Sequence, residues 1–176
     1  MIDHIPEGTI DDEAALRAAY PPQARIVELK CLPAIDRHIA RFISLSPFLV
    51  IGSSHPERGT DVSPRGDAPG FAQVIDPNTL MIPDRPGNNR LDTLSNITAN
   101  PEVGLIFFVP GFEETARVNG RARIVTDPAK LAEFAVGGKA PASAILIDVR
   151  EAYLANPIAQ RAVRIRSESG GLHCVF

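Results

Sequence analysis

Thr79–Arg90 reads TLMIPDRPGNNR, a short apolar run that stops at a proline and gives way to a compact polar loop. Leu80, Met81 and Ile82 are typical of a buried strand. The loop holds one acid, two arginines, two asparagines, two prolines and a glycine, and the pattern turns helical after Arg90. A strand that feeds such a loop at the start of a helix is suited to hold an anion, because helix N–H groups and arginine forks both favour negative charge.

The segments on both sides of this stretch predict short strands joined by turns. Apolar runs bounded by Gly, Pro, Asn and Asp are typical of strands. The predicted strands are Phe48–Gly52, Phe71–Ile75, Thr79–Ile82, Val103–Val109, Ala116–Ile124 and Ala144–Val149. Thr60–Ser63 could pair with the first of them as a hairpin across the turn residues Ser53–Gly59. Because no βαβ alternation recurs, about six strands indicate a small, mainly antiparallel barrel with peripheral helices.

Residues 116–124 carry the clearest alternation in the chain. Small or apolar residues occupy every second position from Ala116 to Ile124. The positions between them hold Arg117, Asn119, Arg121 and Arg123. This pattern predicts a strand with one buried face and one basic face. We expect Arg121 and Arg123 to lie on a solvated surface.

Four helices are predicted around the strands. They are Asp11–Ala19, Ile35–Ser44, Asn89–Ala99 and a helix that starts at Asp127-Pro128 and ends near Gly137-Gly138. Ser63–Phe71 is rich in Gly and Pro and is expected to be a loop. The tail from Arg150 to Phe176 is ambiguous.

Composition places the chain among ordinary globular proteins. A length of 176 residues suits one domain, which we divide into a helical region (1–46), a barrel core (47–150) and a tail (151–176). The net charge of -3 gives no global field for nucleic acid or membranes. The two cysteines lack zinc-site spacing, so no metal site is expected. The acidic N-terminus has no signal-peptide core, which indicates a cytoplasmic protein.

No catalytic residue can be identified from the sequence, but several arginines lie beside loop-forming residues. None of the four histidines sits in a motif, and nucleotide-binding glycine patterns are absent. The cluster comprises Ser63, Arg65 and Asp67, then Asp84, Arg85, Asn88, Asn89 and Arg90, and finally Arg117. These arginines could recognise a phosphate in bidentate fashion. Alternatively, Arg65 with Asp67, and Asp84 with Arg85, could form loop salt bridges of small value. The residues alone leave both interpretations open.

Three stretches together resemble a known family. They are SPRGDAPGF from Ser63, TLMIPDRPGNNRLDTLSNITANPEVGLIFFVPG from Thr79, and ETARVNGRARI from Glu114. This string resembles the pyridoxamine 5'-phosphate oxidase-like superfamily of FMN-binding split β-barrels, and in particular a bacterial subgroup with the SPRGD…PDRPGNNR pattern. The resemblance is dense from about Phe48 to Asp127. It implies a six-stranded antiparallel split barrel that forms a homodimer with FMN at the subunit interface.

The resemblance also implies which positions contact the cofactor. The first loop would contact the flavin through Ser63, Pro64, Arg65, Gly66 and Asp67. The end of the next strand would lie against the isoalloxazine at Ile82 and Pro83. The FMN phosphate would be held by Asn89 and Arg90, with Asp84, Arg85 and Asn88 nearby. The neighbouring hairpin would line the site with Thr115 and Arg117.

One departure from the family pattern bears on function. Many relatives carry an HCPKA-like motif after the last strand, whereas here Ala155, Asn156 and Ile158 stand where His, Cys and Lys are expected. The resemblance implies an FMN-dependent oxidoreductase that acts on a small molecule with a reduced nicotinamide or a similar reductant. The alternatives are a flavin- or small-ligand-binding protein without turnover, or a structural homodimer that has lost the cofactor.

Overall fold

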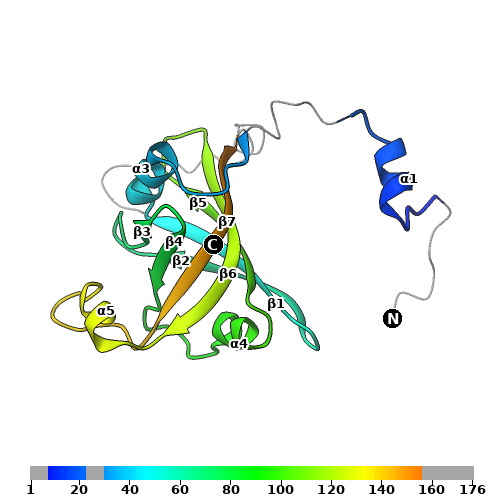
Figure 1. The fold of residues 1–176 in the computed structure, drawn as a ribbon. Helices are drawn as coiled ribbons and strands as arrows, with labels where there is room; N and C mark the ends of the chain where they lie inside the picture. Colours follow the sequence, from blue (N-terminus) through cyan, green and yellow to red (C-terminus); the bar gives the residue numbers. More distant parts are fainter. Residues whose placement is uncertain (1–7, 23–29, 156–176) are drawn as a thin grey trace. The chain divides into compact units, whose positions relative to one another are not determined.

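The computed structural model describes residues 8–22 and 30–155 of the chain (Figure 1). Chain contacts divide the protein into two compact units, Met1–Lys30 and Cys31–Phe176. The first unit contains α1 (Glu13–Ala18), which begins where Asp12 accepts a hydrogen bond from the backbone N–H of Ala15 at 2.8 Å. Every described residue of this short helix is exposed. The helix predicted at Asp11–Ala19 is therefore confirmed, and the rest of this subsection concerns the second unit.

Seven strands form one antiparallel sheet in the order β2-β1-β5-β6-β7-β4-β3. The strands are β1 (Phe48–His55), β2 (Gly59–Gly66), β3 (Gln73–Asp76), β4 (Thr79–Pro83), β5 (Glu102–Phe108), β6 (Thr115–Val125) and β7 (Ala144–Ala155). The sheet curls around its core without closing, because β2 and β3 at its two ends are not paired with each other. The predicted class, a mainly β split barrel with peripheral helices, is confirmed.

The number of strands and two of their boundaries differ from the sequence prediction. The described residues form seven strands instead of six, because β2 pairs with β1 along its whole length, from His55↔Gly59 to Phe48↔Gly66. Residues 63–66, predicted as loop, therefore belong to a strand. Pro64 is compatible with this strand because β2 lies at a sheet edge, where a missing N–H breaks no ladder. At the other end of the chain, β7 continues past residue 150 to Ala155.

Three helices flank the sheet in the described part of this unit. They are α3 (Arg37–Leu45), α4 (Asp92–Ala99) and α5 (Pro128–Ala132). Figure 1 shows α3 and α4 near opposite ends of the barrel. The last two are shorter than predicted, since α5 ends at Ala132 and α4 begins only after the positive-φ residues Asn89 and Leu91. No helix within residues 8–22 and 30–155 is long and apolar enough to cross a membrane.

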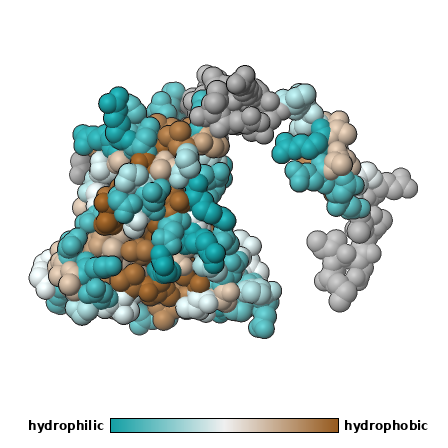
Figure 2. All heavy atoms as spheres, viewed as in Figure 1, coloured by the Kyte–Doolittle hydropathy of each residue, from teal (hydrophilic) through white to brown (hydrophobic). Residues whose placement is uncertain are grey.

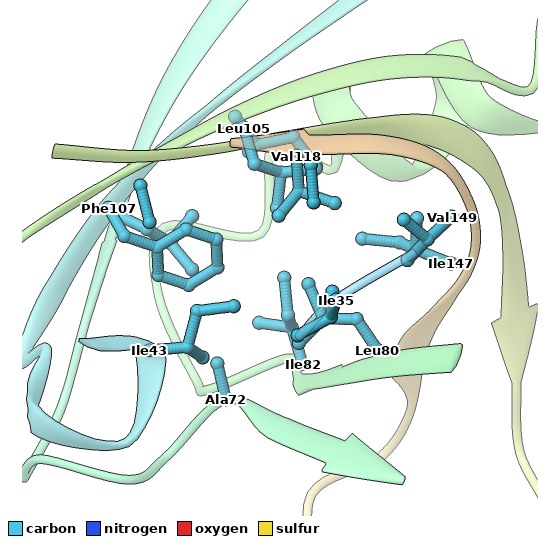
Figure 3. Close-up of a cluster of buried hydrophobic side chains, with 14 of the residues drawn as sticks. Ile35, Ile43, Ala72, Leu80, Ile82, Leu105, Phe107, Val118, Ile147 and Val149 are labelled. Carbon is cyan, nitrogen blue, oxygen red and sulfur yellow. The ribbon is translucent and has the colours of Figure 1, made fainter. Parts of the chain in front are cut away.

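The core fills the inside of the curled sheet. Figure 3 shows side chains from β4, β5, β6, β7 and α3 converging on one another, among them Leu80, Phe107, Val118, Ile147 and Ile43. All five are fully buried. By contrast, Figure 2 shows a largely polar surface with apolar residues visible between the polar ones. The alternation predicted for β6 is confirmed, because Ala116, Val118 and Ala122 are buried whereas Arg117, Arg121 and Arg123 are exposed.

A β-bulge interrupts the long β6–β7 ladder. Asn119 pairs with Glu151 but the next residue, Gly120, pairs with Val149, so Arg150 is an extra residue on β7. The backbones approach closely at this point: a Cβ atom on Gly120 would lie 2.2 Å from the carbonyl oxygen of Asp148. Only glycine fits there without a shift of the backbone.

Candidate functional site

Two arginine–aspartate pairs join the end of β2 and the residue after it to the loop that follows β4. Arg65 Nη1 lies 2.5 Å from Asp84 Oδ1, and Arg85 Nε lies 2.6 Å from Asp67 Oδ2. Because β2 is one edge of the sheet and β4 is next to the other edge, these pairs bridge the split of the barrel. The alternative considered from the sequence, in which Arg65 pairs with Asp67 and Asp84 pairs with Arg85, is therefore wrong. Each acid instead pairs with the arginine on the other side of the split.

The first pair is largely buried, and it leaves one donor without a partner. The side chains of Arg65 and Asp84 are each only 19% exposed. Arg65 lies opposite Leu49 in the β1–β2 register, so its side chain is on the inner face of the sheet with that core residue. Among the described residues, Arg65 Nε is the only buried side-chain N or O atom without a hydrogen-bond partner. An unpaired buried donor costs free energy, so an acceptor placed beside Arg65 Nε would be stabilising.

The second pair reaches a third segment of the chain. Besides Asp67, the Arg85 guanidinium donates through Nη1 to the carbonyl oxygen of Phe134 at 2.7 Å. Phe134 packs with Met81, Leu131 and Ala144 in a small second core. Arg85 therefore fastens the α5 segment to both loops. Sequence reasoning missed this contact because the acceptor is a backbone carbonyl, which any residue type supplies.

The environment of Asp67 holds the pKa of its carboxyl below the ordinary value of 3.8. The largest cause is the hydrogen bond from the backbone N–H of Ala68, at 2.7 Å, and the charge and hydrogen bond of Arg85 act in the same direction. Partial burial opposes them and raises the pKa. The ionised form is favoured overall, so Asp67 is a carboxylate at neutral pH.

We expect Asp67→Asn to lower the free energy of unfolding at pH 7 by on the order of 1 kcal/mol, as for a lost charge-assisted hydrogen bond. A carboxyl with a depressed folded-state pKa stabilises the fold above its unfolded pKa and loses this effect as pH falls through the folded value. The difference between wild type and variant should therefore shrink between pH 5 and pH 3. Urea unfolding at both pH values measures it, and a difference that grows in acid would show that the sign is wrong.

A third group of predicted residues lies at the start of α4. The side chain of Asn88 accepts a hydrogen bond from the backbone N–H of Arg90 at 3.1 Å. Arg90 pairs with Asp92 at 2.8 Å and its side chain remains 74% exposed. Asn89 and Leu91 both have positive φ, at 57° and 58°. Among the described residues, no side chain caps the helix with a hydrogen bond, and the unpaired N–H groups at a helix start favour an anion.

The remaining predicted residues are spread over both faces of the sheet. The side chain of Ile82 lies in the core (Figure 3). Pro83 is buried at the end of β4. Thr115 is buried as well. Arg117 lies on the outer face, where its guanidinium carbon stands 5.4 Å from the ring centre of Tyr153. The sheet therefore separates Arg117 from Arg65.

Three further residues complete the set of predicted cofactor contacts. Ser63 is half-buried, whereas Pro64 and Gly66 are exposed on the edge strand. Of the departures from the family pattern, Ala155 is the last residue of β7, and Asn156 and Ile158 lie outside the described residues. The described part of the chain holds no group of three or more His, Cys, Asp or Glu residues that could bind a metal ion.

An antiparallel sheet that curls around one core without closing places the protein in the class of split β-barrels. The sequence profile of the family described as Pyridoxamine 5'-phosphate oxidase matches residues 35–168, most of the chain. The chain belongs to this family, as its sequence resemblance implied. No curated protein matches the chain.

Solved structures share the fold at low sequence identity. HupZ of Group A Streptococcus has a TM-score of 0.54 and 17% identity, and the match covers 69% of this chain and 99% of HupZ. A putative pyridoxamine 5'-phosphate oxidase from Lactobacillus delbrueckii has a TM-score of 0.53 and 15% identity, with coverage of 69% and 95%. An FMN-binding protein from Syntrophomonas wolfei has a TM-score of 0.51 and 9% identity, with coverage of 74% and 92%.

Proposed function

We propose that this protein binds FMN and acts as an oxidoreductase on a small molecule, with a reduced nicotinamide or a similar reductant as electron donor. The observation that carries the proposal is the uncapped start of α4, reached by Asn89 and Arg90, in a chain of this family. An open helix N-terminus beside an arginine suits a phosphate monoester such as that of FMN.

The described residues fit such a cofactor in two respects. The first N–H groups of α4 and the exposed Arg90 supply donors for the phosphate, while Asp92 currently holds the arginine. The buried Nε of Arg65 has no acceptor among the described residues, and a polar edge of the cofactor would give it one. Bound FMN would supply the redox chemistry, and these residues would bind and orient it.

Two further expectations belong to this proposal. The family resemblance favours a homodimer with the flavin site at the subunit interface, which light scattering of the purified protein tests. Ala155, Asn156 and Ile158 stand where the family motif has His, Cys and Lys, and this departure favours a second candidate function, a flavin-binding protein without turnover.

Spectroscopy separates these functions. Purified protein incubated with FMN should keep a flavin absorption spectrum after gel filtration, and a colourless protein would contradict both flavin proposals. Bleaching of the bound flavin by NADH or NADPH within the time of a turnover indicates the oxidoreductase. A flavin that binds but stays oxidised with either donor indicates the carrier.

We expect Arg90→Ala to weaken FMN binding at least tenfold, about 1.4 kcal/mol, because it removes the cation closest to the phosphate position. Fluorescence titration of FMN measures the dissociation constant. Arg123→Ala is the matched control, since Arg123 is also an exposed arginine paired with one aspartate, Asp148. Its dissociation constant should stay within twofold of wild type. An unchanged constant for Arg90→Ala would place the phosphate elsewhere.

A further inference from the structure

A pocket of about 560 Å³ lies where β1, β5, β6 and β7 run side by side, away from the bridged split. Its floor contains Gly52 and Gly104, which are direct partners in the β1–β5 register. Because neither glycine has a side chain, the sheet is bare at this point. The residues around the floor include Ser54, Thr60, Glu102, Asn119, Arg150 and Glu151. The volume is within the range of small-molecule sites.

The β6–β7 bulge supplies the charged side of this pocket. In a regular strand, neighbouring residues point to opposite faces. Here Val149 and Ala152 are buried, and the two residues between them, Arg150 and Glu151, both line the pocket. Bulges re-aim side chains in this way, and they are frequent beside functional sites. The bulge that requires glycine at position 120 therefore also places Arg150 and Glu151 on the same face of the sheet.

One of the two carboxylates that line the pocket does not pair with an arginine of the described residues. Arg150 forms an ion pair with Glu102, which also receives Arg121 at 3.6 Å. Glu151 instead accepts a hydrogen bond from the neutral amide of Asn119, Nδ2 to Oε1, at 2.5 Å. Within residues 8–22 and 30–155, Glu151 has no salt bridge. Both arginines near the pocket are therefore paired with Glu102, and Glu151 is the lining carboxylate that pairs with neither of them.

The Asn119 amide adds a second acceptor next to this carboxylate. An ionised carboxylate only accepts hydrogen bonds, so Asn119 must present its NH₂ group to Glu151. Its Oδ1 then lies over the glycine floor, where a Cβ atom on Gly104 would come within 3.1 Å of it. Glu151 and Asn119 therefore offer carboxylate and amide oxygens side by side.

We propose that this pocket binds a small organic molecule with a protonated primary amine. The ammonium group carries three donors and one positive charge; it would meet Glu151 and Asn119 Oδ1, with the rest of the molecule over the glycine floor. A hard metal ion fits poorly, because it prefers six or more oxygen ligands and Glu102 already pairs with two arginines. The proposal does not depend on FMN binding.

The test uses the full chain, with benzylamine as probe and benzyl alcohol as its uncharged counterpart. We expect benzylamine to shift the backbone amide NMR signals of Gly52, Gly104 and Gly120, and benzyl alcohol to bind at least tenfold more weakly. Glu151→Gln should weaken benzylamine binding at least tenfold with little change in thermal stability. Asp148→Asn removes a carboxylate from the same strand outside the pocket and should change binding less than twofold.

Three results would overturn the proposal. Equal affinity for benzylamine and benzyl alcohol would show that the positive charge does not contribute to binding. An unchanged affinity of the Glu151→Gln variant for benzylamine would show that Glu151 does not accept the ammonium group. If benzylamine leaves all three glycine signals unmoved, it does not bind at this pocket. FMN titration of the same samples is independent of each result.

Discussion

Gly120→Ala is expected to destabilise the barrel by about 3 kcal/mol, because an added Cβ cannot be accommodated at the bulge. The methyl group would stand 2.2 Å from the carbonyl oxygen of Asp148 and 3.0 Å from Cγ2 of Ile147. The first neighbour is backbone in the middle of the longest ladder of the sheet, so a rotamer change cannot relieve the clash. The melting temperature should fall by roughly 6–12 °C.

The matched control is Gly52→Ala in the same sheet. A Cβ there would meet only the carbonyl oxygen of Gly104, at an ordinary 3.7 Å. We expect its melting temperature to stay within a few degrees of wild type. If Gly120→Ala and Gly52→Ala had the same melting temperature, β6 and β7 would not approach as closely as the bulge requires.

Asp84→Asn should lower the free energy of unfolding by about 2–3 kcal/mol, somewhat less than for a fully buried pair. The change leaves the Arg65 cation largely buried without its counter-ion, and Arg65 Nε already lacks a partner. Since this pair bridges the two ends of the open sheet, the loss should appear in the whole barrel. Urea unfolding followed by circular dichroism measures it.

Two further variants distinguish this interpretation from a general effect of the mutation. Adding Arg65→Met to Asp84→Asn should recover part of the loss, because it removes the unpaired charge. Asp148→Asn breaks the exposed pair with Arg123 and should cost less than about 0.5 kcal/mol. A double variant less stable than Asp84→Asn would contradict a buried ion pair at the split.

Local patterns predicted most of the fold. The alternation of β6 identified its buried face, because a strand with one side in the core must repeat every two residues. The helix predicted at Ile35–Ser44 from its apolar face is observed as α3 at Arg37–Leu45, and Ile39, Phe42 and Ile43 are indeed buried. The length of edge strand β2 was underestimated, because its Pro and Gly residues are typical of loops. Only the pairing with β1 keeps these residues extended.

The arginines and aspartates that meet at the split were singled out from the sequence, but the pairs that they form were not predicted. Arg65, Asp67, Asp84 and Arg85 were all identified, yet their crossed pairing depends on the split bringing β2 and β4 together. Sequence spacing favours neighbours within one loop and carries no information on such long-range pairs. Tyr153 beneath Arg117, and the bulge at Gly120, depend on the β6–β7 register and were missed for the same reason.

The comparison of FMN with riboflavin tests the central proposal most directly, because the two ligands differ only in the phosphate. If the N-terminus of α4 and Arg90 hold that phosphate, FMN should bind at least a hundredfold more tightly, about 2.7 kcal/mol, as expected for two charge-assisted hydrogen bonds. Fluorescence titration of the purified protein gives both dissociation constants. Equal affinity for the two flavins, or no binding of either, would contradict the assignment of this loop as a phosphate site.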